Sequence, residues 1–131
     1  MPAAAEAARR QPDLVLVLNH TGMPIDRTLD GIRLWREGMR ALAACPNVVV
    51  KISGLGMTDH RWTVASLRPF VRETIELFGT RRCLFASDFP VDRLYSDYTT
   101  LWTAYATITA DLSADERADL FEHNARRVDR L

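Results

Sequence analysis

The stretch LVLVLNHTGMP, residues 14–24, decides the fold that we predict. Its apolar run, Leu14–Asn19, is typical of a strand that is covered on both faces of a parallel sheet. The histidine His20 and a glycine turn follow this run immediately. Two further apolar runs, Val48–Ser53 and Cys83–Ser87, end at the polar segments SGLG and SDFP. Three short strands that end in this way predict a shared polar edge.

Helical patterns precede, separate and follow the three predicted strands. Ser66 is expected to cap the third helix, with Pro69 in its first turn, and Ser113 opens a capping box. The predicted helices are Ala3–Arg10, Leu29–Ala44, Ser66–Phe78, Ser96–Ala110 and Ser113–Arg127. The strands begin about 35 residues apart, which is the period of βαβ units with parallel strands. We therefore expect one α/β domain, residues 1–131, with a parallel sheet.

Charge and composition exclude several classes of partner. The 131 residues contain 17 basic and 17 acidic side chains, so the zero net charge gives no footprint for nucleic acid. No apolar run approaches the roughly 20 residues of a membrane span, and the start of the chain lacks the apolar core of a signal peptide. Cys45 and Cys83 are isolated and lack metal-ligand spacing. We expect a cytoplasmic protein that binds neither nucleic acid nor membrane.

The carboxyl ends of the predicted strands hold the candidate site, because function gathers at this edge of parallel sheets. By strand alternation His20 shares a face with Leu18, and Asp88 shares one with Leu84. If these faces point the same way as that of Lys51, the three polar side chains converge on one pocket. Histidine offers a neutral nitrogen to a metal or a carbonyl oxygen, and aspartate binds metal or takes a proton from water.

Structural roles remain open for the same three residues. His20 would cap a turn, Asp88 would accept a hydrogen bond in an Asx-turn, and Lys51 would pair with a carboxylate at the surface. His60 and His123 are expected at the surface or in caps. The tryptophans are expected in the core or in a cleft wall. They are Trp35, Trp62 and Trp102.

Four blocks of the sequence resemble the amidohydrolase-related family (amidohydrolase 2). They read LNHTGMP, PNVVVKISGLGM, FGTRRCLFASDFPVD and HNARRV, and they occur in the family's order. Within the family they are most similar to the branch of predicted metal-dependent hydrolases that includes lactonases. The resemblance implies the C-terminal part of a TIM-like (β/α)8 barrel, about three strand–helix units, with its site at the carboxyl face.

The resemblance also implies roles for four residues. His20 matches the histidine that contacts metal or polarises the scissile carbonyl. Asp88 matches the aspartate that ligates metal and acts as the general base on water. Lys51 and Ser53 match the family's K-x-S-G strand, where we expect substrate binding. The implied activity is a hydrolase in which water attacks the C–O or C–N carbonyl bond of a small lactone or carboxylate-bearing molecule.

The sequence departs from the family pattern in its length. A complete barrel takes about 250 residues, whereas this chain offers three strands, and the His-x-His pair of the family's first strand is absent. We therefore expect little or no activity from the isolated chain. Two alternatives stay open for the cofactor: a divalent metal such as zinc or manganese, or metal-independent hydrolysis.

Two further interpretations assign no catalysis of this kind. The chain would be a non-catalytic half-barrel remnant, or a module that pairs with a separate N-terminal half-barrel. Self-association would cover the open walls only in part, because six strands from two copies remain fewer than eight. A flavodoxin-like α/β domain is disfavoured, because HTGMP holds a single glycine before proline and makes a poor phosphate cradle.

Overall fold

The computed structural model describes residues 1–130 and contains a parallel sheet of three strands. The strands are β1 (Leu16–Leu18), β2 (Val48–Ile52) and β3 (Cys83–Phe85). They lie in the order β1-β2-β3, with Leu18 paired with Val50 and Lys51 paired with Leu84. The predicted parallel sheet is confirmed, although each strand is shorter than expected.

Helices and short turns connect these strands. The α-helices are α1 (Pro2–Arg10), α2 (Leu29–Ala43), α3 (Val64–Phe78), α4 (Tyr98–Ile108), α5 (Ala114–Ala118) and α6 (Asn124–Asp129). A π-helical turn, η5 (Asp119–His123), joins α5 to α6. The 3-10 turns are η1 (His20–Gly22), η2 (Gly56–Thr58), η3 (Thr80–Arg82) and η4 (Val91–Leu94). Within residues 1–130, no helix is both long and apolar enough to span a membrane.

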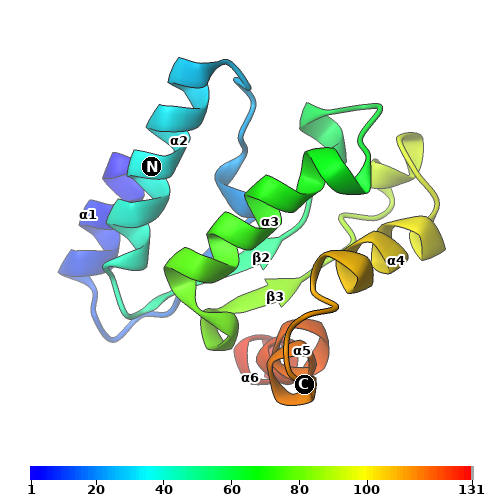
Figure 1. Cartoon of the computed structure of the whole chain (residues 1–131). Coiled ribbons are helices and arrows are strands. Elements are labelled where there is room, and N and C mark those ends of the chain that lie inside the picture. Colours follow the sequence, from blue (N-terminus) through cyan, green and yellow to red (C-terminus); the bar gives the residue numbers. More distant parts are fainter. Residues whose placement is uncertain (131) are drawn as a thin grey trace.

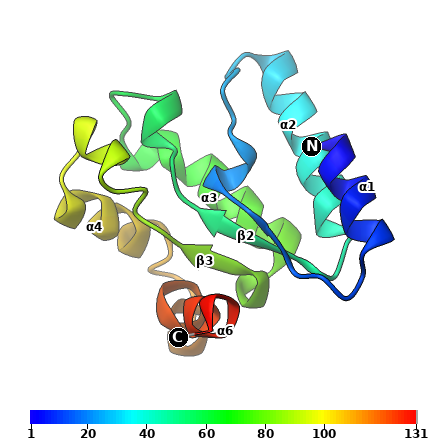
Figure 2. The ribbon, with the colours of Figure 1, turned by 180° about the vertical axis from the view of Figure 1, so that it is seen from behind.

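The helices leave one side of the sheet open to view. Figure 1 shows α2 and α3 lying over the same side of the strands. Figure 2 shows β2 and β3 from behind, where no helix of residues 1–130 crosses in front of them. The segment from α5 to α6 packs against β3 at the far edge of the sheet. Helices α2 and α3 therefore cover one side of the sheet, and on the other side Leu84 is 1% exposed and Lys51 pairs with Asp129 of α6.

The third helix begins earlier than predicted. Thr63, and not Ser66, is its N-cap, and the two residues form a reciprocal capping box. The Thr63 hydroxyl accepts from the Ser66 N–H at 3.1 Å, so the helix starts at Val64 and Pro69 falls in the second turn. The capping box predicted at Ser113 is confirmed.

One face of the sheet forms the main core. Val50, Ile52 and Phe85 lie on this face, and they pack among buried helix side chains such as Met39 and Tyr105. The ring of Phe85 stacks on Tyr105 of α4 with centroids 4.3 Å apart. This apolar layer fixes the strands against α2, α3 and α4, and so fixes the positions of the strand ends.

The pairing register contradicts the predicted sharing of faces. Leu18 pairs with Val50 and therefore faces the core, whereas Lys51 and its partner Leu84 face the opposite side. Strand alternation by itself would thus send His20 and Lys51 to opposite sides of the sheet.

β1 is an edge strand, and it is not covered on both faces as its apolar run predicted. Within residues 1–130 no strand lies beyond it. The preceding residues Leu14 and Val15 are 62% and 58% exposed. An apolar strand at an uncovered edge offers both unpaired backbone groups and apolar surface to another segment.

Both cysteines are buried and free. Burial raises the pKa of the Cys83 thiol to about 12, against the opposing effect of the Arg82 guanidinium. No disulfide or thiolate chemistry is therefore expected of Cys83.

Candidate active site

Three polar side chains meet at the carboxyl ends of the three strands. They are His20 after β1, Ser53 after β2 and Asp88 beyond β3. His20 Nδ1 lies 3.1 Å from Ser53 Oγ and 3.8 Å from Asp88 Oδ1. The predicted approach of His20 and Asp88 is confirmed by these distances.

The backbone conformation after each strand brings these side chains together. His20, Thr21 and Met23 all have φ between 52° and 54°, and Gly22 has φ of 69°, so four consecutive residues are left-handed. Asp88 has φ of 56°. Left-handed φ is uncommon outside glycine and is a genuine outlier for a β-branched residue such as Thr21. The chain leaves the strand geometry before His20 and Asp88, so alternation no longer sets their direction.

A glycine makes room for the imidazole of His20. Gly54 follows Ser53 with φ of 64°, and a Cβ at this position would lie 2.7 Å from His20 Nδ1. The methyl carbon of Met57 would lie 2.8 Å from the same Cβ. Glycine here therefore serves both the turn after β2 and the close approach of the His20 ring.

The contacts of Asp88 and His20 do not match the structural roles that remained open for them. The Phe89 N–H donates to Ser87 Oγ at 3.3 Å, and within residues 1–130 Asp88 Oδ2 is buried without a hydrogen-bond partner. The His20 ring contacts Ser53 on the neighbouring strand. A buried carboxylate oxygen without a donor costs free energy, so its presence beside a histidine points to a site that receives a ligand or a proton.

Asp92 is a further acidic residue of the site, and it is not among the residues predicted from sequence. It lies in η4, its N–H donates to the Asp88 carbonyl at 3.1 Å, and only 3% of it is exposed. Burial and then the Asp88 charge raise the pKa of Asp92 to about 6, while His20 and the Gly56 N–H act in the opposite direction. The motif SDFPVD offers a second carboxylate four residues after Asp88, but no helix joins the two residues, so their spacing alone does not indicate that they lie in one site.

Lys51 and Ser53 occupy different surroundings. Lys51 Nζ lies 3.3 Å from Asp129 Oδ1 of α6, which is the ion-pair role that was left open for it. Among the hydrogen bonds and ion pairs of residues 1–130, Lys51 has none with His20 or Asp88. Ser53 is 2% exposed, and its hydroxyl is hydrogen-bonded to the His20 ring. Substrate binding by either residue stays a prediction.

The other histidines and Trp35 lie as expected. His60 stacks on Tyr95 with ring centroids 4.3 Å apart. His123 Nδ1 is 3.5 Å from Asp119 Oδ1 within the final helical segment. Trp35 is 4% exposed and belongs to the core.

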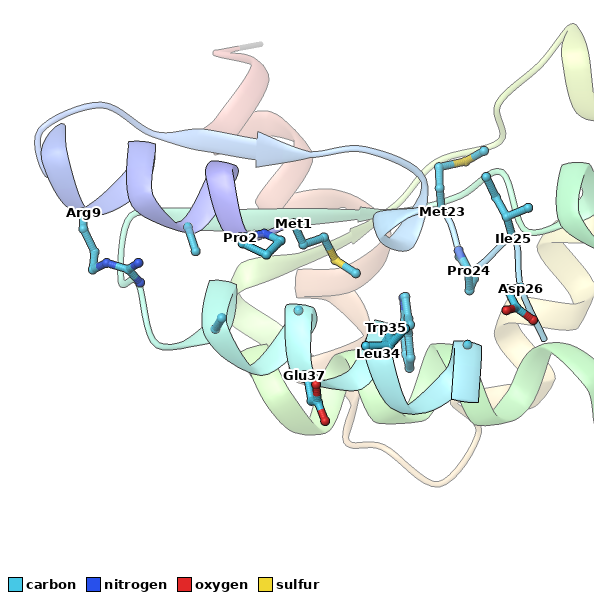
Figure 3. A pocket seen from close by; sticks show the side chains of 14 residues that line it. Met1, Pro2, Arg9, Met23, Pro24, Ile25, Asp26, Leu34, Trp35 and Glu37 are labelled. Carbon is cyan, nitrogen blue, oxygen red and sulfur yellow. The ribbon is translucent and has the colours of Figure 1, made fainter. Parts of the chain in front are cut away.

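A groove of about 570 Å³ lies away from this site, between α1, α2 and the segment after η1. Figure 3 shows Met1 and Pro2 on one side of it, and Pro24, Ile25 and Trp35 toward its other end. His20, Ser53 and Asp88 do not line it. The groove therefore belongs to the packing of α1 on α2 and does not enlarge the candidate active site.

The donor set of the chain does not by itself fit a catalytic metal. Catalytic zinc usually has three protein ligands and a water. Within residues 1–130, no three side chains of the His, Cys, Asp and Glu types are arranged to hold a metal ion. His20 and Asp88 supply two donors, so this part of the chain offers an incomplete set.

Comparison with known sequences identifies the family of the chain. The amidohydrolase family model matches residues 1–131. A Sinorhizobium fredii protein designated y4mH is 49% identical over 120 residues, which cover 92% of this chain and 40% of that protein. The L-fucono-1,5-lactonase of Burkholderia ambifaria is 36% identical, over 99% of this chain and 47% of the lactonase.

Comparison with solved structures gives the same result. A Burkholderia multivorans amidohydrolase with bound HEPES has a TM-score of 0.90 and 31% identity, over 96% of this chain and 48% of that one. A second crystal form with bound zinc gives 0.89 and 30%, over 96% of this chain and 47% of that one. The chain thus spans less than half the length of these relatives, and its three-stranded sheet is part of a TIM-like (β/α)8 barrel. These observations together show that the chain belongs to the amidohydrolase family.

Proposed function

We propose that the chain carries one part of a hydrolytic site that opens a small lactone with water. The observation that carries this proposal is the approach of His20 Nδ1 to Asp88 Oδ1 at 3.8 Å, beside the unpartnered Asp88 Oδ2. Both residues lie at the carboxyl ends of parallel strands, the edge where barrel enzymes hold their reacting groups. The lactonase activity named for the Burkholderia relatives supports this choice of substrate class.

The two side chains have complementary tasks in this reaction. The Asp88 carboxylate takes a proton from water while the water oxygen attacks the lactone carbonyl carbon. When Ser53 Oγ–H donates to Nδ1 of His20, the ring carries its proton on Nε2, from which it donates to the carbonyl oxygen. As the ring C–O bond breaks, Asp88 returns its proton to the leaving alkoxide. The product is a hydroxy acid, and the carboxylate of Asp88 is regenerated.

The test replaces Asp88 with Asn. The assay follows hydrolysis of L-fucono-1,5-lactone by the chain co-expressed with the part of the Burkholderia ambifaria lactonase that it does not cover. We expect Asp88→Asn to lower kcat by about 100-fold or more, because loss of the general base typically costs 10²–10⁴-fold. Asp129→Asn, which removes a surface partner of Lys51, is the matched control and should retain activity. Full activity of Asp88→Asn would exclude Asp88 as the base.

We propose that a divalent ion such as zinc or manganese, if it binds, also takes ligands from outside residues 1–130. The zinc in the Burkholderia multivorans structure supports this, and the two donors His20 and Asp88 would contribute from this chain. Bound metal would supply Lewis acidity at the carbonyl oxygen. Zinc titration of the chain alone is expected to give weak binding, whereas tight stoichiometric binding would contradict a shared site.

A second candidate function is a non-catalytic module that pairs with another half-barrel, with self-association as a variant of it. The exposed apolar residues Leu14 and Val15 beside the edge strand β1 favour this reading. Copurification with a chain that supplies the remaining strands, without lactone hydrolysis by the pair, would favour the module.

A cytoplasmic location is proposed because Cys45 and Cys83 are both unpaired.

A further inference from the structure

The left-handed turn that carries His20 needs support from outside itself. His20, Thr21 and Met23 are not glycines, yet all three have positive φ. Such conformations persist only where the surrounding structure over-determines them. The Met23 N–H donates to the His20 carbonyl at 2.8 Å, which closes the turn but does not attach it to the rest of the fold.

Two hydrogen bonds of Thr21 attach the turn to its neighbours. The Trp35 indole N–H of α2 donates to the Thr21 carbonyl at 2.9 Å, and Thr21 Oγ1 donates to the Ser53 carbonyl at 3.3 Å. Thr21 is fully buried. The residue next to His20 is therefore held from one side by a helix and from the other by the end of β2.

Trp35 is itself fixed in place. It is 4% exposed, and its ring packs edge-on against Phe70 of α3 with centroids 5.2 Å apart. Figure 3 shows the ring rising from α2 toward the segment that contains Met23 and Pro24. A rigid donor on a helix is suited to hold a strained turn, because its own position does not depend on that turn.

We infer that Trp35 is a positioning residue for His20. Its indole N–H holds the Thr21 carbonyl, and this keeps Nδ1 of the adjacent imidazole against Ser53 Oγ. Trp35 does not touch the reacting groups and acts through Thr21. The inference rests on the proposed function only in so far as His20 is a site residue, since it concerns the placement of the ring and not the reaction.

The test measures the ¹⁵N chemical shifts of the His20 imidazole in the full chain. Ser53→Ala defines the shifts of a ring without its Nδ1 partner, and His20→Gln assigns the signals. Trp35→Phe removes the indole donor. Trp102→Phe is the matched control, because it removes an indole whose buried Nε1 has no hydrogen-bond partner within residues 1–130. Where Trp35→Phe fails to fold, a benzothienylalanine at position 35 keeps both rings and lacks only the N–H.

We expect the Trp35 variants to move the His20 shifts to the values of Ser53→Ala, and Trp102→Phe to leave them unchanged. A purely structural role of Trp35 would lower stability without moving these shifts, and that result would overturn the inference. Identical His20 shifts in the unmodified chain and in Ser53→Ala would also overturn it. None of these outcomes requires turnover, so a failure to hydrolyse lactones would count against the proposed function alone.

Discussion

At the scale of single residues, the site contains buried carboxylates whose oxygens are not all hydrogen-bonded. Asp88 Oδ2 and Asp92 Oδ1 both lack hydrogen-bond partners within residues 1–130. Burial raises the free-energy cost of charging Asp92, and repulsion by the nearby Asp88 carboxylate adds to it. The protein therefore gives up stability at this edge of the sheet, as is common where polar groups are kept for a ligand.

This cost predicts a pH-dependent stability that Asp92 controls. Its pKa is raised from 3.8 to about 6 in the folded chain, so the native state holds this proton more tightly than the unfolded state. The contribution of Asp92 to the free energy of unfolding is therefore fully present below pH 4 and is lost as pH rises through 6. Asp92→Asn should remove this loss and raise the free energy of unfolding at pH 7 by up to about 3 kcal/mol, since each pKa unit corresponds to about 1.36 kcal/mol.

Urea unfolding at a series of pH values from 4 to 7 measures the effect. The matched control is Asp129→Asn, because Asp129 is an exposed carboxylate that pairs with Lys51. If Asp92→Asn and the unmodified chain lose stability in parallel between pH 4 and 6, the raised pKa of Asp92 is not the source of the slope.

At the scale of elements, the sequence predicted three parallel strands with polar ends, but it did not predict the backbone conformation at those ends. Apolar runs and their spacing were sufficient for β1, β2 and β3, because burial in a parallel sheet requires such runs. The prediction that His20 and Asp88 lie close together was correct, but strand alternation alone does not explain it. It depends on left-handed residues after the strands, and propensity does not predict positive φ at a threonine such as Thr21.

The start of α3 and the burial of Asp92 could not be predicted for related reasons. Thr63 and Ser66 are both good caps, and only the reciprocal hydrogen bonds in the folded chain distinguish the cap from its partner. Asp92 stands in a short turn, where a carboxylate is ordinarily exposed, so its burial was not visible from sequence. The expectation that Lys51 shares a face with the residue before His20 was wrong, because the pairing register decides which strand faces agree. Substrate binding by Lys51 stays a prediction.

The contact between the end of β2 and the turn after β1 gives a prediction at the same scale. Gly54→Ala should displace the His20 ring, because its Cβ would lie 2.7 Å from Nδ1. Gly79 is a matched control, since it has φ of 75° and no atom within 4 Å of the added Cβ. We expect Gly79→Ala to cost about 1–2 kcal/mol from φ alone. Gly54→Ala should cost about 1–3 kcal/mol more, from overpacking.

Thermal unfolding and the His20 imidazole shifts measure this difference. Equal losses of stability for the two alanine variants, with the His20 signals unchanged, would mean that the ring does not depend on the space above Gly54.

At the scale of the whole molecule, the chain is one part of a barrel with an open edge. It covers 40–48% of the relatives with which it was compared, and its edge strand β1 has a partner on one side only within residues 1–130. An apolar edge of this kind is ordinarily covered by another strand or blunted by charge. The proposed assembly with a second half-barrel therefore depends on the surface around Val15.

Val15→Asp should weaken that assembly without unfolding the chain. Val15 is 58% exposed here, so the substitution leaves the core intact, whereas a carboxylate would be buried without a partner on assembly. We expect affinity for the complementary half-barrel to fall by at least about tenfold, which corresponds to 1.4 kcal/mol. Leu29→Asp is the control, because Leu29 is 91% exposed at the start of α2. Equal binding by Val15→Asp and the unmodified chain, in a sedimentation titration, would contradict assembly through β1.

The burial of the Cys45 and Cys83 thiols has a practical consequence. Cys45 lies behind the packing of α1 on α2, and Cys83 lies in β3, the strand on which α5 to α6 pack. Because neither sulfur is accessible in the closed fold, an alkylating reagent can reach it only when the surrounding elements separate. The labelling rates of the two cysteines would therefore report separately on how often each end of the sheet comes apart. A complementary half-barrel that slows both labelling rates would therefore stabilise the whole chain against opening.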